Sequence, residues 1–306
     1  MTLAPSIGGR IVELELGGRQ WLWANPDLPF GPPVEGASYA ETGNSGGYDE
    51  CFPTVAACVL ASGTPRYGGL ALPDHGELWT QHPAVHFDRD DDGQRATCAW
   101  TGQRLPYRFL RSVQITHAGE LRVGYTIENT GAVPLPFLWS SQPMLPLTDV
   151  TRLELPTGAL VRVADAQGSA LKGIAAECRW PNVRLARSIA DLAFPAAIAR
   201  RYACKLFVDL PAAPVVLGVT EGPLRLDVRF DGRAVPHVAL WLNNGEVKSP
   251  PDGHPARNLA LAPCIGAADA LTAAIKGGRQ TQWVPAGSSR SWSLTWSARR
   301  LDDAPA

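Results

Sequence analysis

Segment 74–79, Asp-His-Gly-Glu-Leu-Trp, combines the groups that a proton-transfer site needs. It places an imidazole, a side-chain type used for acid/base chemistry in proteins, between a carboxylate and a glycine, with a second carboxylate and an aromatic ring close behind. A histidine in a loop more often has a structural role as a hydrogen-bonding group. The neighbours of His75 favour a chemical role instead, so His75 is our first candidate for acid/base chemistry.

Two other motifs are weaker. Residues 43–47, Gly-Asn-Ser-Gly-Gly, fit the pattern of a serine-hydrolase elbow, but the sequence after them does not begin the helix that such an elbow requires. Residues 88–93 hold three aspartates and a glycine at calcium-loop spacing, yet position 12 is Ala99 where a bidentate glutamate belongs. We therefore expect a plain turn at the first motif and a solvated acidic turn at the second. We expect no metal site.

Composition excludes several classes of partner. The chain has 306 residues, and 28 Lys and Arg against 29 Asp and Glu give a formal net charge of -1. Such a balance provides no basic field for nucleic acid or an anionic membrane. The six cysteines form no CxxC pair and are expected to be free thiols. Since neither a signal peptide nor an apolar run of membrane-spanning length is visible, we expect a cytoplasmic protein without a membrane partner.

Short strands are the elements that must position these groups. Residues 121–128 alternate apolar and polar with period two, and 108–116 is the expected hairpin partner. Convincing helices are few, with 267–275 the best candidate and 189–193 a short second one. Strand follows strand without helices between, which favours one antiparallel domain over 1–306. We expect further strands at 11–16, 21–23, 135–140, 160–163, 205–209, 215–219, 224–230, 237–242 and 291–296.

Several blocks, in order along almost the whole chain, resemble the aldose 1-epimerase (galactose mutarotase-like) family. The stronger ones are Gly-Gly-Tyr-Asp-Glu-Cys-Phe-Pro-Thr at 46–54, the 74–79 segment, and Asn-Thr-Gly at 129–131 followed by Pro-Phe-Leu-Trp-Ser-Ser-Gln-Pro at 136–143. Weaker similarities are Trp-Leu-Asn-Asn-Gly at 241–245 and Leu-Ala-Pro-Cys at 261–264. The resemblance implies an all-β fold, a galactose mutarotase-like antiparallel β-supersandwich with few short helices.

The resemblance also implies a chemistry without a cofactor. A monosaccharide or sugar-like molecule lies in an open cleft, where a base removes the proton of the anomeric hydroxyl and an acid protonates the ring oxygen. The ring opens, the C1 aldehyde rotates, and closure gives the other anomer. His75 matches the family's first histidine and is the implied general acid.

Two positions depart from the family's pattern. Gln142 stands before Pro143 where a second histidine is expected, and Ala262 stands where the base is usually a glutamate. Glutamine cannot supply a proton at neutral pH and alanine offers no polar group. Glu50 and Glu77 are candidates for a relocated carboxylate. Two functions therefore stay open: an active aldose 1-epimerase, or a catalytically silent relative that binds a sugar.

The remaining candidates are residues for binding the sugar. Aromatic rings stack on pyranose C–H faces while polar groups bind the hydroxyls, so candidates inside the family blocks are Asp49, Trp79, Trp139, Gln142, Trp241 and Asn243. Trp292 and Trp296, on a strictly alternating strand, are expected in the core. The identity of the sugar stays open, as does the choice between a monomer and a homodimer.

Overall fold

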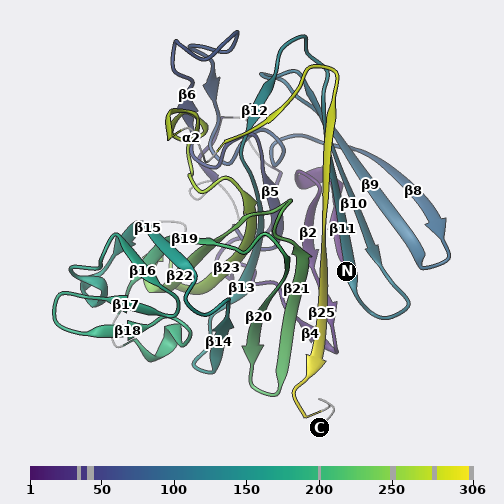
Figure 1. Cartoon of the computed structure of the whole chain (residues 1–306). Coiled ribbons are helices and arrows are strands. Elements are labelled where there is room, and N and C mark those ends of the chain that lie inside the picture. The colour runs from purple at the N-terminus through teal and green to yellow at the C-terminus, as the bar shows by residue number, and fades with distance from the viewer. Residues whose placement is uncertain (33–35, 40–44, 199–200, 249–252, 278–280, 303–306) are drawn as a thin grey trace.

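Two large antiparallel sheets dominate the computed structural model, which describes residues 1–32, 36–39, 45–198, 201–248, 253–277 and 281–302 (Figure 1). The larger has eleven strands. Their spatial order is β1 (Thr2–Ala4), β2 (Arg10–Glu13), β5 (Tyr48–Cys51), β13 (Trp139–Pro146), β23 (Pro255–Ile265), β22 (His237–Lys248), β19 (Ala203–Asp209), β15 (Leu160–Gln167), β16 (Glu177–Arg179), β17 (Asn182–Arg184) and β18 (Ile189–Asp191).

The second sheet has eight strands, in the order β14 (Thr151–Glu154), β20 (Pro214–Glu221), β21 (Leu224–Asp231), β25 (Ser289–Arg300), β11 (Leu121–Asn129), β10 (Tyr107–Ile115), β9 (Gly93–Thr101) and β8 (Ala84–Asp90). Three small pairs are β3 (Glu15–Leu16) with β4 (Arg19–Gln20), β6 (Cys58–Val59) with β7 (Ala71–Leu72), and β12 (Leu135–Phe137) with β24 (Gln282–Val284). Helical segments are short: η1 (Pro5–Ile7), η2 (Ser169–Leu171), η3 (Pro195–Ala197) and α2 (Leu271–Gly277).

The two sheets enclose an apolar core that is rich in aromatic rings. Tyr125 of the smaller sheet lies 4.7 Å from Trp139 of the larger one, measured between ring centroids, and stacks on Trp292. Trp292 and Trp296 are 6% and 1% exposed, which confirms their expected core positions. Successive side chains of a strand point to opposite faces of its sheet, so every second side chain of each strand faces the other sheet and contributes to this core.

The expected all-β antiparallel fold is confirmed, and so is the 121–128 strand. It extends to Asn129 in β11 and pairs with β10 as predicted. The helix expected at 189–193 is wrong: residues 189–191 form β18, with Ile189 70% exposed and Ala190 buried, the alternation of a strand. The helix expected at 267–275 begins only at Leu271, because the Asp269 carbonyl accepts hydrogen bonds from Val55 and Ala56 instead of starting a helical turn.

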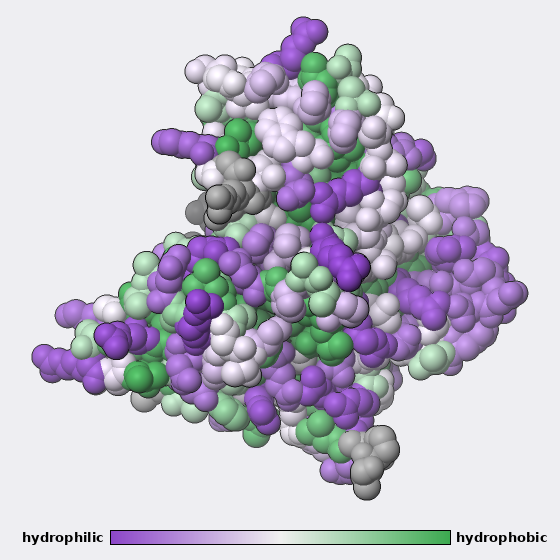
Figure 2. Space-filling model, viewed as in Figure 1, coloured by the Kyte–Doolittle hydropathy of each residue, from purple (hydrophilic) through white to green (hydrophobic). Residues whose placement is uncertain are grey.

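The acidic motif at 88–93 forms the tip of the β8–β9 hairpin, on the protruding hydrophilic lobe at the right of Figure 2. Asp88 pairs there with Arg95, and Asp92 pairs with Arg122, so these carboxylates are engaged by arginines in an exposed turn. At the other motif, β5 follows Ser45 to Gly47 where a hydrolase would have a helix, while 43 and 44 lie outside the described residues. Within the described ranges, no helix is long and apolar enough to cross a membrane.

Candidate functional site

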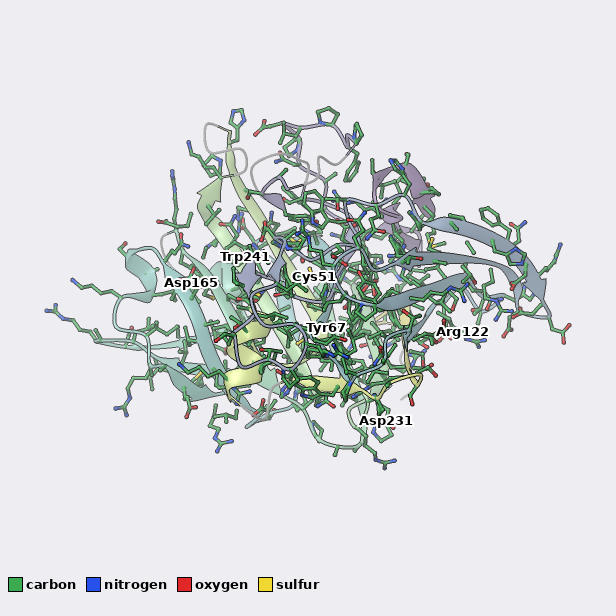
Figure 3. The ribbon with its side chains drawn as sticks, turned by 90° about the horizontal axis from the view of Figure 1, so that it is seen from above. Cys51, Tyr67, Arg122, Asp165, Asp231 and Trp241 are labelled. Atoms are coloured by element: carbon green, nitrogen blue, oxygen red, sulfur yellow. The ribbon has the colours of Figure 1, made fainter. Side chains whose placement is uncertain are left out.

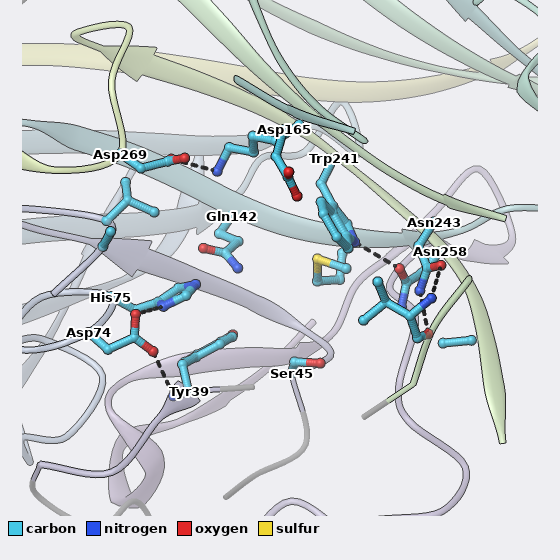
Figure 4. Close-up of a pocket in the computed structure, with 16 residues that line it drawn as sticks. Tyr39, Ser45, Asp74, His75, Gln142, Asp165, Trp241, Asn243, Asn258 and Asp269 are labelled. Carbon is cyan, nitrogen blue, oxygen red and sulfur yellow. Dashed lines mark hydrogen bonds and ion pairs between the residues drawn. The ribbon is translucent and has the colours of Figure 1, made fainter. Parts of the chain in front are cut away.

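A cavity of about 340 Å³ lies on the larger sheet, on the face turned away from the aromatic core (Figure 4). Five adjacent strands, β13, β23, β22, β19 and β15, contribute to it. Leu240 and Leu242, which flank the cavity residue Trp241, belong to the core between the sheets, and this alternation fixes the two faces. The described lining residues are Tyr39, Ser45, Val55, Ala56, Asp74, His75, Gln142, Met144, Asp165, Lys205, Trp241, Asn243, Val247, Ala256, Asn258 and Asp269.

His75 lies on the cavity wall in a tightly constrained turn. Its backbone has φ of 57°, in the left-handed region, and its N–H donates to the Val55 carbonyl at 2.6 Å. Its Nδ1 lies 3.0 Å from Oδ1 of Asp74. This contact directs Nδ1 to the carboxylate and leaves Nε2 as the ring nitrogen for a ligand.

Asp74 is fixed in turn. Burial raises the pKa of the Asp74 carboxyl, but hydrogen bonds from the His75 side chain and from the backbone of Tyr39 and His75 outweigh it, so its pKa is lowered overall. The Asp74 carbonyl also accepts the Trp79 indole N–H at 2.8 Å. Asp74 therefore remains ionised beside the imidazole, where its carboxylate can orient the ring.

Tyr39 holds the imidazole from its other side. The two rings stack with centroids 4.2 Å apart and planes 13° apart. The Tyr39 hydroxyl donates to Asp49 at 2.8 Å, and Asp49 also pairs with Arg10. Asp49, a predicted sugar contact, is buried behind Tyr39 and is not among the described residues that line the cavity. Its present contacts support the His75 wall, the side of the cavity formed by Tyr39, Val55, Asp74 and His75.

The turn at Gly76 permits no side chain. Gly76 has φ of +76°, and a Cβ atom there would lie 2.1 Å from the Phe52 carbonyl oxygen. We expect Gly76→Ala to destabilise the fold by at least about 1–2 kcal/mol from the backbone conformation alone, with the clash adding to this. Urea unfolding measures the loss. Gly119→Ala is the control, because Gly119 has φ of +73° but no atom within 4 Å, so only the conformational cost applies. Equal losses of stability in the two variants would contradict the close approach of Gly76 to the Phe52 carbonyl oxygen.

Gln142, Trp241 and Asn243, three of the predicted sugar contacts, all line the cavity. The Gln142 Oε1 accepts the Cys51 thiol at 2.7 Å, and the Trp241 indole N–H donates to Asn258 at 3.2 Å. The Asn243 side chain is engaged with the backbone of residues 246 and 247. Trp241 is only partly buried, so part of its ring is open to the cavity.

Three further charged residues of the cavity were not found from the sequence: Asp165, Lys205 and Asp269. Lys205 Nζ lies 2.9 Å from Oδ1 of Asp269. Asp269 is bound to the His75 wall through its backbone, because its carbonyl accepts the N–H groups of Val55 and Ala56 at 2.9 and 2.8 Å. Asp269 lies in the short segment between the end of β23 at Ile265 and α2, a loop position where site residues often occur, and that was the available signal.

Glu50, a candidate relocated carboxylate, faces away from the cavity. It is 3% exposed between the sheets, where it accepts the Tyr125 hydroxyl and the Trp139 indole N–H, both at 2.9 Å, and pairs with Arg111. Burial raises the pKa of the Glu50 carboxyl to about 7, although these partners lower it. Its neighbours Asp49 and Cys51 contact cavity residues, and the period of two along β5 separates them from Glu50.

Glu77 and two of the candidate tryptophans are likewise not among the described lining residues. Glu77 is 1% exposed and accepts hydrogen bonds from the Tyr107 hydroxyl and from the backbone of Gln103 and Arg104. Its role in these contacts is to hold the loop before β10. Trp139 lies in the core beside Glu50, while Trp79 supports the His75 turn.

Ala262 lies on the same face of β23 as the cavity residue Asn258, at even spacing along the strand. It is 4% exposed in a small apolar cluster with Ala239, Ala260 and Phe207, against which Trp241 packs. The position where the resemblance implies a glutamate therefore adjoins the cavity and is apolar. Carboxylates reach the cavity from Asp74, Asp165 and Asp269 instead.

Comparisons with known proteins agree with this architecture. No family model matches the chain, and no curated protein matches it significantly. Among solved structures, the Slr1438 protein of Synechocystis is 18% identical with a TM-score of 0.69, covering 97% of this chain and 91% of that one.

Two other similar structures carry functional descriptions. A galactose mutarotase related enzyme from Lactobacillus acidophilus is 14% identical, and a putative aldose 1-epimerase from Escherichia coli is 16% identical. Each has a TM-score of 0.63 and covers 98% of this chain and 95% of its own. This chain therefore has the galactose mutarotase-like fold.

Proposed function

We propose that the protein binds a monosaccharide in the cavity and interconverts its α and β anomers by general acid/base ring opening. One observation carries the proposal: an oriented imidazole, carboxylates and a partly open indole ring converge on one cavity of a mutarotase-like fold. Trp241 supplies an apolar surface for a pyranose ring, and the surrounding amides and carboxylates supply hydrogen-bonding groups for hydroxyls.

The acid and the base are His75 and Asp269. Both are attached to one residue, because the Val55 carbonyl accepts the His75 N–H and the Val55 N–H donates to the Asp269 carbonyl. Asp269 takes over the role that we first assigned to Glu50 or Glu77, since those two carboxylates are held by other groups outside the cavity. Lys205 beside Asp269 stabilises its charge and holds it in place.

In the forward reaction, Asp269 accepts the proton of the anomeric hydroxyl while the imidazolium form of His75 donates its Nε2 proton to the ring oxygen and becomes neutral. The C1–O5 bond breaks as the C1 carbonyl forms. Rotation about C1–C2 presents the other aldehyde face, and the reverse proton transfers close the ring. Gln142 serves as a hydrogen-bonding group and not as a proton donor.

Gln142 and Ala262 favour a second candidate, a silent sugar-binding protein. The Gln142 amide is already engaged by Cys51, and Ala262 is packed in an apolar cluster. This candidate uses the same cavity and the same stacking surface but no proton transfer.

One experiment separates the two functions. Freshly dissolved α-aldoses of gluco, galacto and manno configuration are followed by optical rotation with and without protein, and binding is measured by saturation-transfer NMR. We expect acceleration of at least one sugar. Saturable binding without acceleration would support the silent protein, and absence of both would contradict sugar binding.

Trp241→Ala tests the stacking surface. We expect a loss of sugar affinity of about tenfold, equivalent to about 1.4 kcal/mol, because the ring's apolar contact with the ligand is removed. Calorimetric titration measures the affinity. Trp283→Ala is the matched control, since Trp283 is 40% exposed on the small β12–β24 pair and is not among the described cavity residues. Unchanged affinity in Trp241→Ala would contradict this surface.

A further inference from the structure

We infer that the cavity selects sugars by charge and that Asp165 determines this selection, excluding sugars that carry a carboxylate or phosphate and favouring those that carry an ammonium group. The inference rests on the proposed function, because it concerns the ligand of the same cavity. It assigns to Asp165 a specificity role that is separate from proton transfer by His75 and Asp269.

Asp165 faces the cavity because of a bulge in β15. Val163 is opposite Leu206 and Asp165 is opposite Lys205 on β19, so Ala164 has no counterpart. An extra residue in one strand reverses the side to which the following side chains point. Without it, Asp165 would point with Val163 toward the core between the sheets. Figures 3 and 4 both show Asp165 near Trp241, and Figure 4 shows the two among the residues that line the cavity.

The other charges of the cavity are compensated. Among its described lining residues, Lys205 is the one amine, and it is paired with Asp269 at 2.9 Å. Asp74 is in contact with His75 and is turned toward that wall. Asp165 is exposed, and the Gln167 amide donates to it at 2.9 Å. Lys205 lies opposite Asp165 on β19 but is paired with Asp269, so three carboxylates, Asp74, Asp165 and Asp269, share the cavity with one amine among the described lining residues. The negative charge of Asp165 is therefore available to a ligand.

An anionic sugar would meet this charge, and the described lining residues offer no cation besides Lys205 to balance it. Lys205 carries a single positive charge and is already paired with Asp269 at 2.9 Å, so a phosphate or carboxylate that contacted it would compete with Asp269 for that charge. An ammonium group experiences attraction from the same field. Because Asp165 is exposed, this selection weakens as ionic strength increases.

The test measures affinity by calorimetry for matched ligands: the neutral aldose, the 2-amino sugar and the uronic acid of gluco, galacto and manno configuration. We expect the amino sugar of the preferred configuration to bind at least tenfold more tightly than its uronic acid at low salt. Asp165→Asn keeps the size of the side chain and removes its charge, and we expect it to reduce this ratio at least threefold.

Asp231→Asn is the control, because Asp231 is also exposed and lies far from Asp165 in Figure 3. It should leave the ratio unchanged. Equal affinity for all three charge forms, or an unchanged ratio in Asp165→Asn, would overturn the charge selection while leaving sugar binding intact. Absence of binding by every ligand would overturn the proposed function itself. Thermal unfolding of each variant establishes that it is folded.

Discussion

His75→Ala should reduce the protein-dependent rate of mutarotation by about 10²–10⁴, the usual contribution of a positioned general acid. The imidazole is held by Asp74 at 3.0 Å, by the stacked Tyr39 ring and by its own backbone hydrogen bond to Val55. Alanine removes the proton donor and leaves the surrounding contacts among Tyr39, Asp49 and Arg10 in place. Optical rotation of the sugar that the wild-type protein accelerates measures the effect.

His117→Ala is the matched control, because His117 is exposed in the turn between β10 and β11. A structural role for His75 would lower affinity and rate together, whereas an acid role lowers kcat more than it changes KM. Retention of wild-type kcat in His75→Ala would show that the imidazole is not the acid. Asp269→Asn should show the same kcat-dominated loss if it is the base.

Arg111→Met should lower the free energy of unfolding by about 3–5 kcal/mol at pH 8, because it leaves a buried carboxylate without its cation. Arg111 and Glu50 are 1% and 3% exposed and come from opposite sheets. Arg111 also donates to the Gly9 carbonyl and lies over the Trp100 ring. Urea unfolding followed by tryptophan fluorescence measures the loss. Arg95→Met, at an exposed pair, should leave stability nearly unchanged.

The loss should be smaller at pH 5. Burial raises the pKa of the Glu50 carboxyl from 4.5 to about 7. Between these two pH values the carboxyl is protonated in the folded protein but ionised in the unfolded one. The free energy of unfolding therefore falls as pH rises through this window, by about 3 kcal/mol in total. Below pH 7 the carboxyl is neutral and needs Arg111 less. Arg111→Met combined with Glu50→Gln should lose this pH dependence. A similar loss for Arg111→Met at pH 5 and pH 8 would contradict the raised pKa.

The fold could be predicted well from the sequence for two reasons. Apolar and polar residues alternate along its strands, and blocks that resemble the aldose 1-epimerase family extend over most of the chain. The sequence was less informative about the site. His75, Gln142, Trp241 and Asn243 line the cavity, whereas Glu50 does not. The sequence of β5 does not indicate which of its side chains face the cavity, because the strand is buried on both faces. In a strand that is buried on both faces, the direction of each side chain becomes known only when the packing partners on each face are known.

Asp165 and Asp269 were missed for different physical reasons. A bulge shifts the side-chain period at Ala164, and this shift depends on pairing with β19, which is distant in sequence. The helix expected at 267–275 concealed Asp269, whose carbonyl is bound to Val55 and Ala56. Local sequence patterns carry no information on these two long-range pairings.

The attachment of His75 and Asp269 to the same residue has a consequence for motion. A displacement of Val55 would be transmitted to the backbones of both residues, while Lys205 links the Asp269 side chain to β19. We therefore expect a substitution that shifts the Val55 backbone to affect both proposed proton-transfer groups together.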